Sequence, residues 1–169
     1  MKTLIVILIA ALFVPLYSLQ AQERGQGYLI FAPGVSTTHE AEFGPATFHV
    51  GGGGEGFIYR GVGVGAEIGY VALWSASGDG PGVGSVNASY HLRHGATAGS
   101  VEPFVTAGYT LFARHGTVSS ANFGGGINYW LRSKAAVRFE TRYQGIGLHV
   151  PHFGGAAPNV VFRIGLTWR

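Results

Sequence analysis

Residues 135–144 read AAVRFETRYQ and residues 160–169 read VVFRIGLTWR, and these two stretches decide the fold. In both, apolar and aromatic residues alternate with charged or small ones, which is the two-residue period of a β-strand. The charged positions of the first stretch are Arg138, Glu140 and Arg142. We therefore predict that the chain ends in two long strands, each with one apolar face and one polar face.

The apolar faces of these strands need a cover, because only 11% of the 169 residues are charged. In an outer-membrane barrel, apolar side chains face hydrocarbon while small or charged ones fill the lumen, and this is the arrangement that we expect. Alternation alone does not say which face is inside. The opposite assignment describes a soluble, secreted, lipocalin-like barrel that binds an apolar ligand, and it would turn inward Phe139, Tyr143, Phe162 and Trp168.

The composition fits a single all-β domain rich in glycine. The chain has 29 glycines and no cysteine, which excludes disulfides, a thiol nucleophile and zinc–thiolate sites. The formal net charge of +3 is too small and too dispersed to indicate a nucleic-acid partner. The run of four glycines at 51–54 has strand residues on both sides, so we predict a tightly curved strand there rather than a flexible loop.

The N-terminus predicts export. Residues 1–3 include a lysine, residues 4–16 are apolar, and a short polar stretch follows that ends at Ala21, which is the pattern of a secretory signal peptide. The apolar run is shorter than the about 20 residues that a membrane-spanning helix needs. We expect cleavage after Ala21, which gives a signal peptide of residues 1–21 and a barrel domain of residues 22–169.

Alternation and turn residues divide the rest of the chain into eight strands of about ten residues, the length that a tilted strand needs to cross a bilayer. Connections after the odd-numbered strands are generally longer than those after the even-numbered ones, as expected for surface loops against periplasmic turns. The connection at 93–100 is the exception. The expected strands cover residues 27–35, 47–59, 62–73, 83–92, 101–113, 121–131, 135–144 and 160–169.

Three of these segments resemble the small outer-membrane β-barrel family, the OmpA/OmpX-like barrel domain. They are VEPFVTAGY at 101–109, NFGGGINYWL at 122–131 and VRFETRY at 137–143. The resemblance implies an eight-stranded antiparallel up-and-down transmembrane barrel with a plugged lumen, inserted by the outer-membrane assembly machinery. Family members usually end in an aromatic residue, whereas here Trp168 is followed by Arg169.

The inward positions of such a barrel carry charges that must pair, because a lone buried ion is costly. His91 and Glu55 are expected to point inward as well. Eight strands leave an interior only wide enough for side chains, so we expect a plugged lumen, with a narrow channel as the alternative. The predicted lumen salt-bridge network consists of Glu67, Arg138, Glu140, Arg142 and Arg163.

Outward aromatic residues near strand ends are expected to lie at the membrane interfaces. They are Tyr28, Tyr59, Trp74, Phe112, Tyr143 and Trp168.

No catalytic, cofactor or metal site is predicted. His149 and His152 lie in an extended His-Val-Pro-His stretch without the helical spacing of zinc proteases, and His39 and His115 are expected in other loops. No histidine precedes a serine by two residues, the pattern of the lipid A deacylases. The predicted role is non-enzymatic: the barrel contacts outer-membrane lipid, stabilises the envelope or presents its loops to a surface partner.

Overall fold

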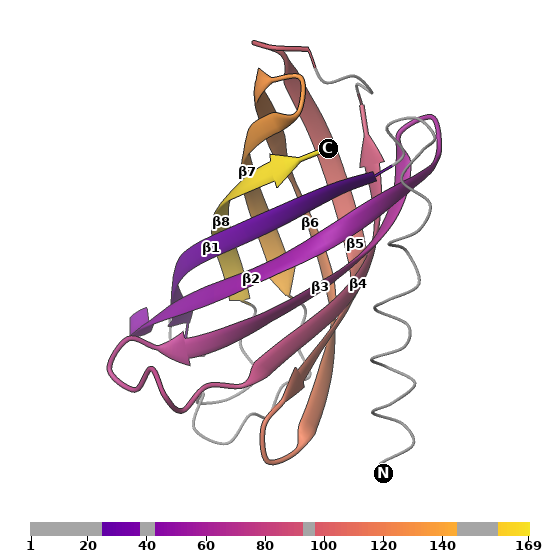
Figure 1. Ribbon diagram of the computed structural model, residues 1–169. Coiled ribbons are helices and arrows are strands. Elements are labelled where there is room, and N and C mark those ends of the chain that lie inside the picture. The colour runs from indigo at the N-terminus through magenta and orange to yellow at the C-terminus, as the bar shows by residue number, and fades with distance from the viewer. Residues whose placement is uncertain (1–24, 38–42, 93–96, 145–158) are drawn as a thin grey trace.

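The computed structural model describes residues 25–37, 43–92, 97–144 and 159–169, and within them eight strands close into one barrel (Figure 1). Every strand pairs antiparallel with its neighbours in sequence, and β1 pairs with β8 to close the cylinder. The predicted signal peptide lies outside the described residues. The strands are β1 (Gly25–Thr37), β2 (Phe43–Tyr59), β3 (Val62–Leu73), β4 (Gly82–His91), β5 (Val101–Ala113), β6 (Thr117–Arg132), β7 (Ala135–Gln144) and β8 (Asn159–Trp168).

The predicted strands are all present, and most differences in bounds are a few residues at the ends. The largest differences are at the starts of β2 and β6, which begin at Phe43 and Thr117, each four residues earlier than predicted. The loop predicted at 114–120 is therefore a three-residue turn. Thr117 pairs with Ala113, and the Tyr109 hydroxyl lies 2.7 Å from the Ser119 hydroxyl. The connection after β5 is therefore shorter than predicted, although it is still longer than those after β2 and β6, and the connection between β4 and β5 is the exception that the sequence indicated.

The two ends of the barrel differ in their connections. One end, which we call the turn end, holds the C-terminus together with the connections at 60–61, 92–100 and 133–134; of these residues, 93–96 are not described. The opposite end, the loop end, holds those at 74–81 and 114–116.

The turn between β2 and β3 has two residues, as predicted. Arg60 and Gly61 adopt φ values of 37° and 86°, the left-handed conformation that the tightest hairpins require. A Cβ atom at Gly61 would collide with the carbonyl oxygen of His91, so glycine is needed there on steric grounds too.

The glycine run at 51–54 lies inside β2, as predicted, and is paired on both sides. Gly53 is the partner of Tyr28 in β1 and of Glu67 in β3. A Cβ atom at Gly53 would lie 2.7 Å from the Tyr28 hydroxyl, so the missing side chain makes room for a large residue on the neighbouring strand.

The polarity of the barrel is the reverse of that of a soluble one. Phe139 and Phe162 face outward and are 45% and 67% exposed, whereas Arg138 and Arg163 face the lumen and are 3% and 4% exposed. The lipocalin-like alternative requires the opposite orientation and is therefore wrong. No helix in the described part of the chain is long and apolar enough to cross a membrane.

Candidate functional site: the lumen

The lumen contains an ionic group that we call the central cluster: Glu67, Arg138, Glu140, Arg142 and Arg163. Glu140 of β7 is its centre and accepts hydrogen bonds from three arginines. Arg138 Nε donates at 3.0 Å, Arg142 Nε at 2.7 Å, and Arg163 Nη1 at 3.0 Å. All five side chains are at most 4% exposed, so these contacts form away from bulk water.

Glu67 of β3 is the second carboxylate of the central cluster. Its Oε2 lies 2.5 Å from Arg163 Nη2 and 3.6 Å from Arg142 Nη1, and it accepts a hydrogen bond from the Tyr28 hydroxyl at 3.2 Å. The structure thus brings all five residues of the predicted network into contact. Three guanidinium groups face two carboxylates, so loss of either carboxylate leaves buried positive charge without compensation.

Aromatic rings and missing side chains shape the space around the central cluster. The guanidinium carbon of Arg138 lies 3.9 Å from the centre of the Phe104 ring and 4.8 Å from that of Tyr28, within the range of cation–π interactions. On the neighbouring strand β6, a Cβ atom at Gly126, the register partner of Phe104, would come within 2.9 Å of the Phe104 ring. Inward glycines therefore offset the bulk of the arginines and aromatic rings.

A second group, the mouth cluster, lies at the turn end and consists of Glu55, His91, Glu102 and Arg169. His91 lies between the two carboxylates: its Nδ1 is 2.6 Å from Glu102 Oε1 and its Nε2 is 3.2 Å from Glu55 Oε1. Both ring nitrogens face acceptors, an arrangement that the doubly protonated imidazolium satisfies fully. The His91 ring also stacks on Phe104, with ring centres 5.3 Å apart.

Glu102 has the most contacts in the mouth cluster and is fully buried. Arg169 Nη2 donates to its Oε2 at 2.8 Å, Asn128 Nδ2 donates at 3.2 Å and Trp130 Nε1 at 3.3 Å. Arg169 also lies over the Trp130 ring, 4.4 Å from its centre. The residue after the last strand therefore points into the lumen, on the same face as Arg163 and Thr167.

Sequence reasoning placed His91 and Glu55 inward but missed Glu102 and Arg169. The signal for Glu102 was present, because it shares the two-residue period of Thr106 and Thr110, which also face the lumen. The signal for Arg169 was present too, because it shares the two-residue period of Arg163 and Thr167 in β8.

Of the six predicted interfacial aromatics, three lie clearly on the outer surface. Tyr59 is 64% exposed, Trp74 56% and Trp168 46%. Tyr143 is half-buried and packs against Phe123, with ring centres 4.8 Å apart.

The prediction is wrong for Tyr28 and Phe112, which face the lumen at 5% and 9% exposure. Tyr28 alternates with the outward Leu29, and its hydroxyl has a carboxylate partner inside. Phe112 alternates with the outward Leu111 in the same way. At both positions the alternation of side chains along the strand decides which way the aromatic ring points, and its distance from the strand end does not.

The histidines of the described residues form no metal site. His49 faces the lumen with its Nε2 4.0 Å from Glu67 Oε1, and His115 is exposed in the turn after β5. His39, His149 and His152 lie outside the described residues. No group of three or more potential metal ligands occurs within the described ranges.

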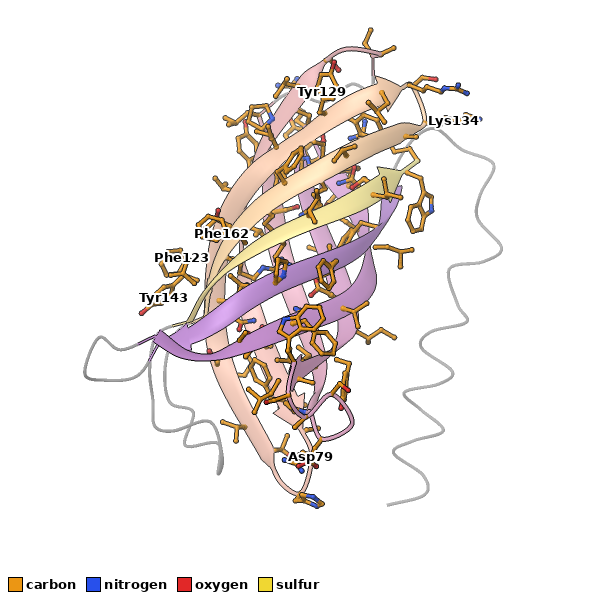
Figure 2. The ribbon with its side chains drawn as sticks, turned by 90° about the vertical axis from the view of Figure 1, so that its left-hand side faces the viewer. Asp79, Phe123, Tyr129, Lys134, Tyr143 and Phe162 are labelled. Carbon is orange, nitrogen blue, oxygen red and sulfur yellow. The ribbon has the colours of Figure 1, made fainter. Side chains whose placement is uncertain are left out.

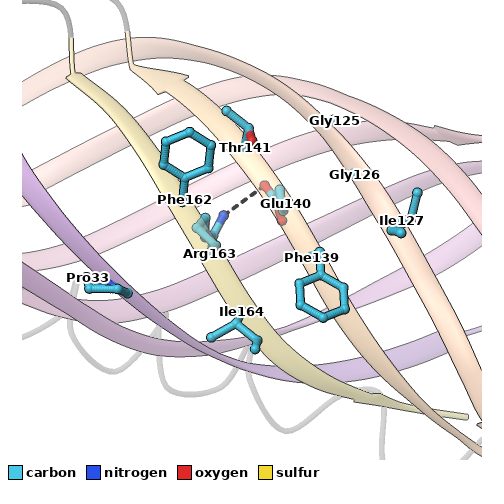
Figure 3. A pocket seen from close by; sticks show the side chains of 10 residues that line it. All are labelled: Pro33, Gly125, Gly126, Ile127, Phe139, Glu140, Thr141, Phe162, Arg163 and Ile164. Carbon is cyan, nitrogen blue, oxygen red and sulfur yellow. Dashed lines mark hydrogen bonds and ion pairs between the residues drawn. The ribbon is translucent and has the colours of Figure 1, made fainter.

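The outer wall carries a shallow groove of about 370 Å³ over β6, β7 and β8 (Figure 3). Its walls are the rings of Phe139 and Phe162 with Ile127 and Ile164, and its floor includes Gly125. These four side chains are apolar and belong to the outward faces of their strands. The lining also includes the lumen-facing Glu140 and Arg163, which are only 3% and 4% exposed, so the groove offers mainly apolar surface.

The sequence matches no protein-family model and no curated protein. Solved structures with the same fold are small barrels. The N-terminal β-barrel domain of Pseudomonas aeruginosa OprF is 14% identical with a TM-score of 0.60, covering 86% of this chain and 96% of that one. Neisserial surface protein A (NspA) is 12% identical with a TM-score of 0.60, covering 85% and 96%. Ail, the attachment invasion locus protein of Yersinia pestis, is 13% identical with a TM-score of 0.51, covering 87% and 99%.

These likenesses confirm, at the level of the fold, the resemblance to small eight-stranded outer-membrane barrels that the sequence predicted.

Proposed function

We propose that this chain is an outer-membrane β-barrel protein with a structural or surface-interaction role, exported through a signal peptide cleaved after Ala21 and inserted by the outer-membrane assembly machinery. The observation that carries the proposal is the reversed polarity of the barrel. Large apolar side chains cover the outside, while four of the five described carboxylates are buried in the lumen. Water would penalise such an exterior, whereas hydrocarbon covers it at no cost in unpaired polar groups.

The distribution of aromatic residues supports a membrane-spanning orientation. At the turn end Tyr59, Tyr129 and Trp168 are 64%, 41% and 46% exposed. At the loop end the exposed Trp74 packs on Phe48, with ring centres 5.0 Å apart. Two aromatic bands separated by an apolar belt are typical of barrels that cross a bilayer.

The lumen of the proposed barrel is closed by side chains rather than open as a channel. At the turn end Trp130 and Phe104 are 0% and 2% exposed. At the loop end Val83 and Phe112 occupy inward positions at 5% and 9% exposure. An eight-stranded barrel has little interior space beyond its own side chains, so the central cluster serves to hold the walls together.

The proposed role is non-enzymatic and resides in the outer surface and the loop end. His91 and His49 approach carboxylates rather than a serine, and so no nucleophile and base are paired there. Two proteins of the same fold are described as a surface protein and an attachment protein. By analogy, we assign to the loop end the presentation of connections such as 74–81 to a partner outside the cell.

Cell fractionation with heat-modifiable gel mobility tests this proposal. We expect the mature chain in the outer-membrane fraction, resistant to carbonate washing, with a mobility that changes on boiling. Release by carbonate, or identical mobility before and after boiling, would contradict it. Planar-bilayer recordings test the closed lumen separately, because steady single-channel conductance from the purified barrel requires an open path.

A further inference from the structure

The exposed charges of the barrel are sorted by sign and by end. Four of the five described carboxylates lie inside the lumen, and the fifth, Asp79, is at the loop end in an ion pair with Arg114. Among the charged side chains that the structure describes, those exposed at the turn end are all cations. Arg60 and Lys134 in its short turns and Arg132 at the end of β6 are all exposed, and we call them the basic rim. Figure 2 shows Lys134 and Asp79 at opposite ends of the molecule.

The three cations of the basic rim form no ion pair with a carboxylate of the part of the chain that the structure describes. Arg60 also has a positive φ of 37°, a conformation that asparagine or glycine adopts more readily. A cation therefore occupies a position where the backbone alone would favour another residue.

The basic rim lies beside the aromatic band of the turn end. The Arg60 guanidinium carbon is 5.3 Å from the centre of the Tyr59 ring. Lys134 directly precedes Ala135, the register partner of Trp168. Aromatic rings mark the depth at which headgroups begin, so the rim cations lie at the level of lipid phosphates.

We propose that the basic rim binds the phosphates of anionic phospholipids in the leaflet at the turn end. The inference rests on the proposed membrane-spanning function, and charge complementarity identifies the occupant. A cation close to an anionic membrane surface favours association by about fivefold, and the attraction falls off within a Debye length. The rim thereby selects the lipids around one end of the barrel and fixes the depth of that end.

Tryptophan quenching by brominated lipid tests this selection. The barrel is folded into phosphatidylcholine vesicles that contain a minority of phosphatidylglycerol, with bromine on the acyl chains of one lipid or the other. A Trp74→Phe protein leaves Trp168 as the reporter at the turn end. A Trp168→Phe protein leaves Trp74 as the matched reporter at the loop end. Trp130 is buried in the lumen of both proteins and gives a constant background.

The expected result is preferential quenching of Trp168 by brominated phosphatidylglycerol, up to about fivefold over phosphatidylcholine, without such a preference at Trp74. The preference should disappear in the variant Arg60→Asn, Arg132→Gln, Lys134→Gln, where asparagine keeps the turn conformation. It should also disappear for the unmodified rim in 1 M salt, where the Debye length is about 3 Å, so the test stands even if the triple variant does not fold.

The outcomes separate the two proposals. If the barrel inserts and shows heat-modifiable mobility, but both lipids quench Trp168 equally, the basic rim does not select lipid and only this inference is overturned. A preference that survives both the triple variant and high salt overturns it as well. If the chain does not insert into vesicles, the proposed function itself is overturned, and the rim has no membrane to bind.

Discussion

Replacement of Glu140 by glutamine would test the energetic importance of the central cluster. Glu140 accepts hydrogen bonds from three arginines and is 3% exposed, and Gln keeps its shape while removing its charge. Three buried guanidinium groups would then face Glu67 as the one remaining carboxylate of the cluster. Breaking a buried ion pair from one side costs about 3–5 kcal/mol, so we expect the free energy of unfolding to fall by that amount.

The assay is urea unfolding of the barrel in vesicles, followed by heat-modifiable mobility and tryptophan fluorescence. The matched control is Asn87→Ala, because Asn87 also faces the lumen but neither polar atom of its side chain has a hydrogen-bond partner in the described part of the chain. We expect this control to lose about 1 kcal/mol or less.

A double-mutant cycle separates the ionic contribution from simple loss of packing. Arg138 bonds to Glu140, and so Glu140→Gln combined with Arg138→Gln restores the original excess of one positive charge. We expect the double variant to be more stable than the sum of the two single changes by about 0.5–3 kcal/mol. A Glu140→Gln loss no larger than that of Asn87→Ala, with additive single changes, would refute the reasoning.

Three further predictions use the same unfolding assay. Gly53→Leu should crowd the lumen and cost about 1–3 kcal/mol, whereas the outward Gly54→Leu should be tolerated; equal losses would contradict the assigned faces. Ile164→Arg, on the outer face of β8, should cost up to about 2–4 kcal/mol in a bilayer and Ile164→Leu very little; a tolerated arginine would argue against lipid at that face. Arg169→Gln should cost about 1–3 kcal/mol because Glu102 loses a charged partner, and an unchanged midpoint would show that the contact contributes nothing.

The two-residue period predicted much of the fold and the central cluster. In β7 and β8 the parity of Arg138, Glu140 and Arg163 was read correctly, because a slip of one residue would turn every side chain to the opposite face. Which face is inside could not be read from alternation alone. Low charge, the N-terminal segment and the family resemblance favoured the correct assignment.

The errors have a common physical source. Polar residues usually indicate a loop, but in this barrel they form the interior, so the Thr-Val-Ser-Ser stretch at 117–120 was read as a loop although it belongs to β6. Tyr28 and Phe112 were assigned outward because aromatic residues near strand ends are common at membrane interfaces. Alternation along β8 turns Arg169 inward, but its contact with Glu102 joins residues 67 positions apart, and local patterns do not identify that partner.

The contact between Arg169 and Glu102 links closure of the barrel to the balance of charge in the mouth cluster. The seam of the cylinder forms when β1 pairs with β8, with Gly27 opposite Trp168. In the closed barrel the following residue, Arg169, reaches Glu102 of β5. Without Arg169, the mouth cluster holds two carboxylates and a single histidine. With Arg169 in place, the two carboxylates face two basic side chains. Closure of the barrel and neutralisation of the charge at its mouth are therefore coupled through Arg169.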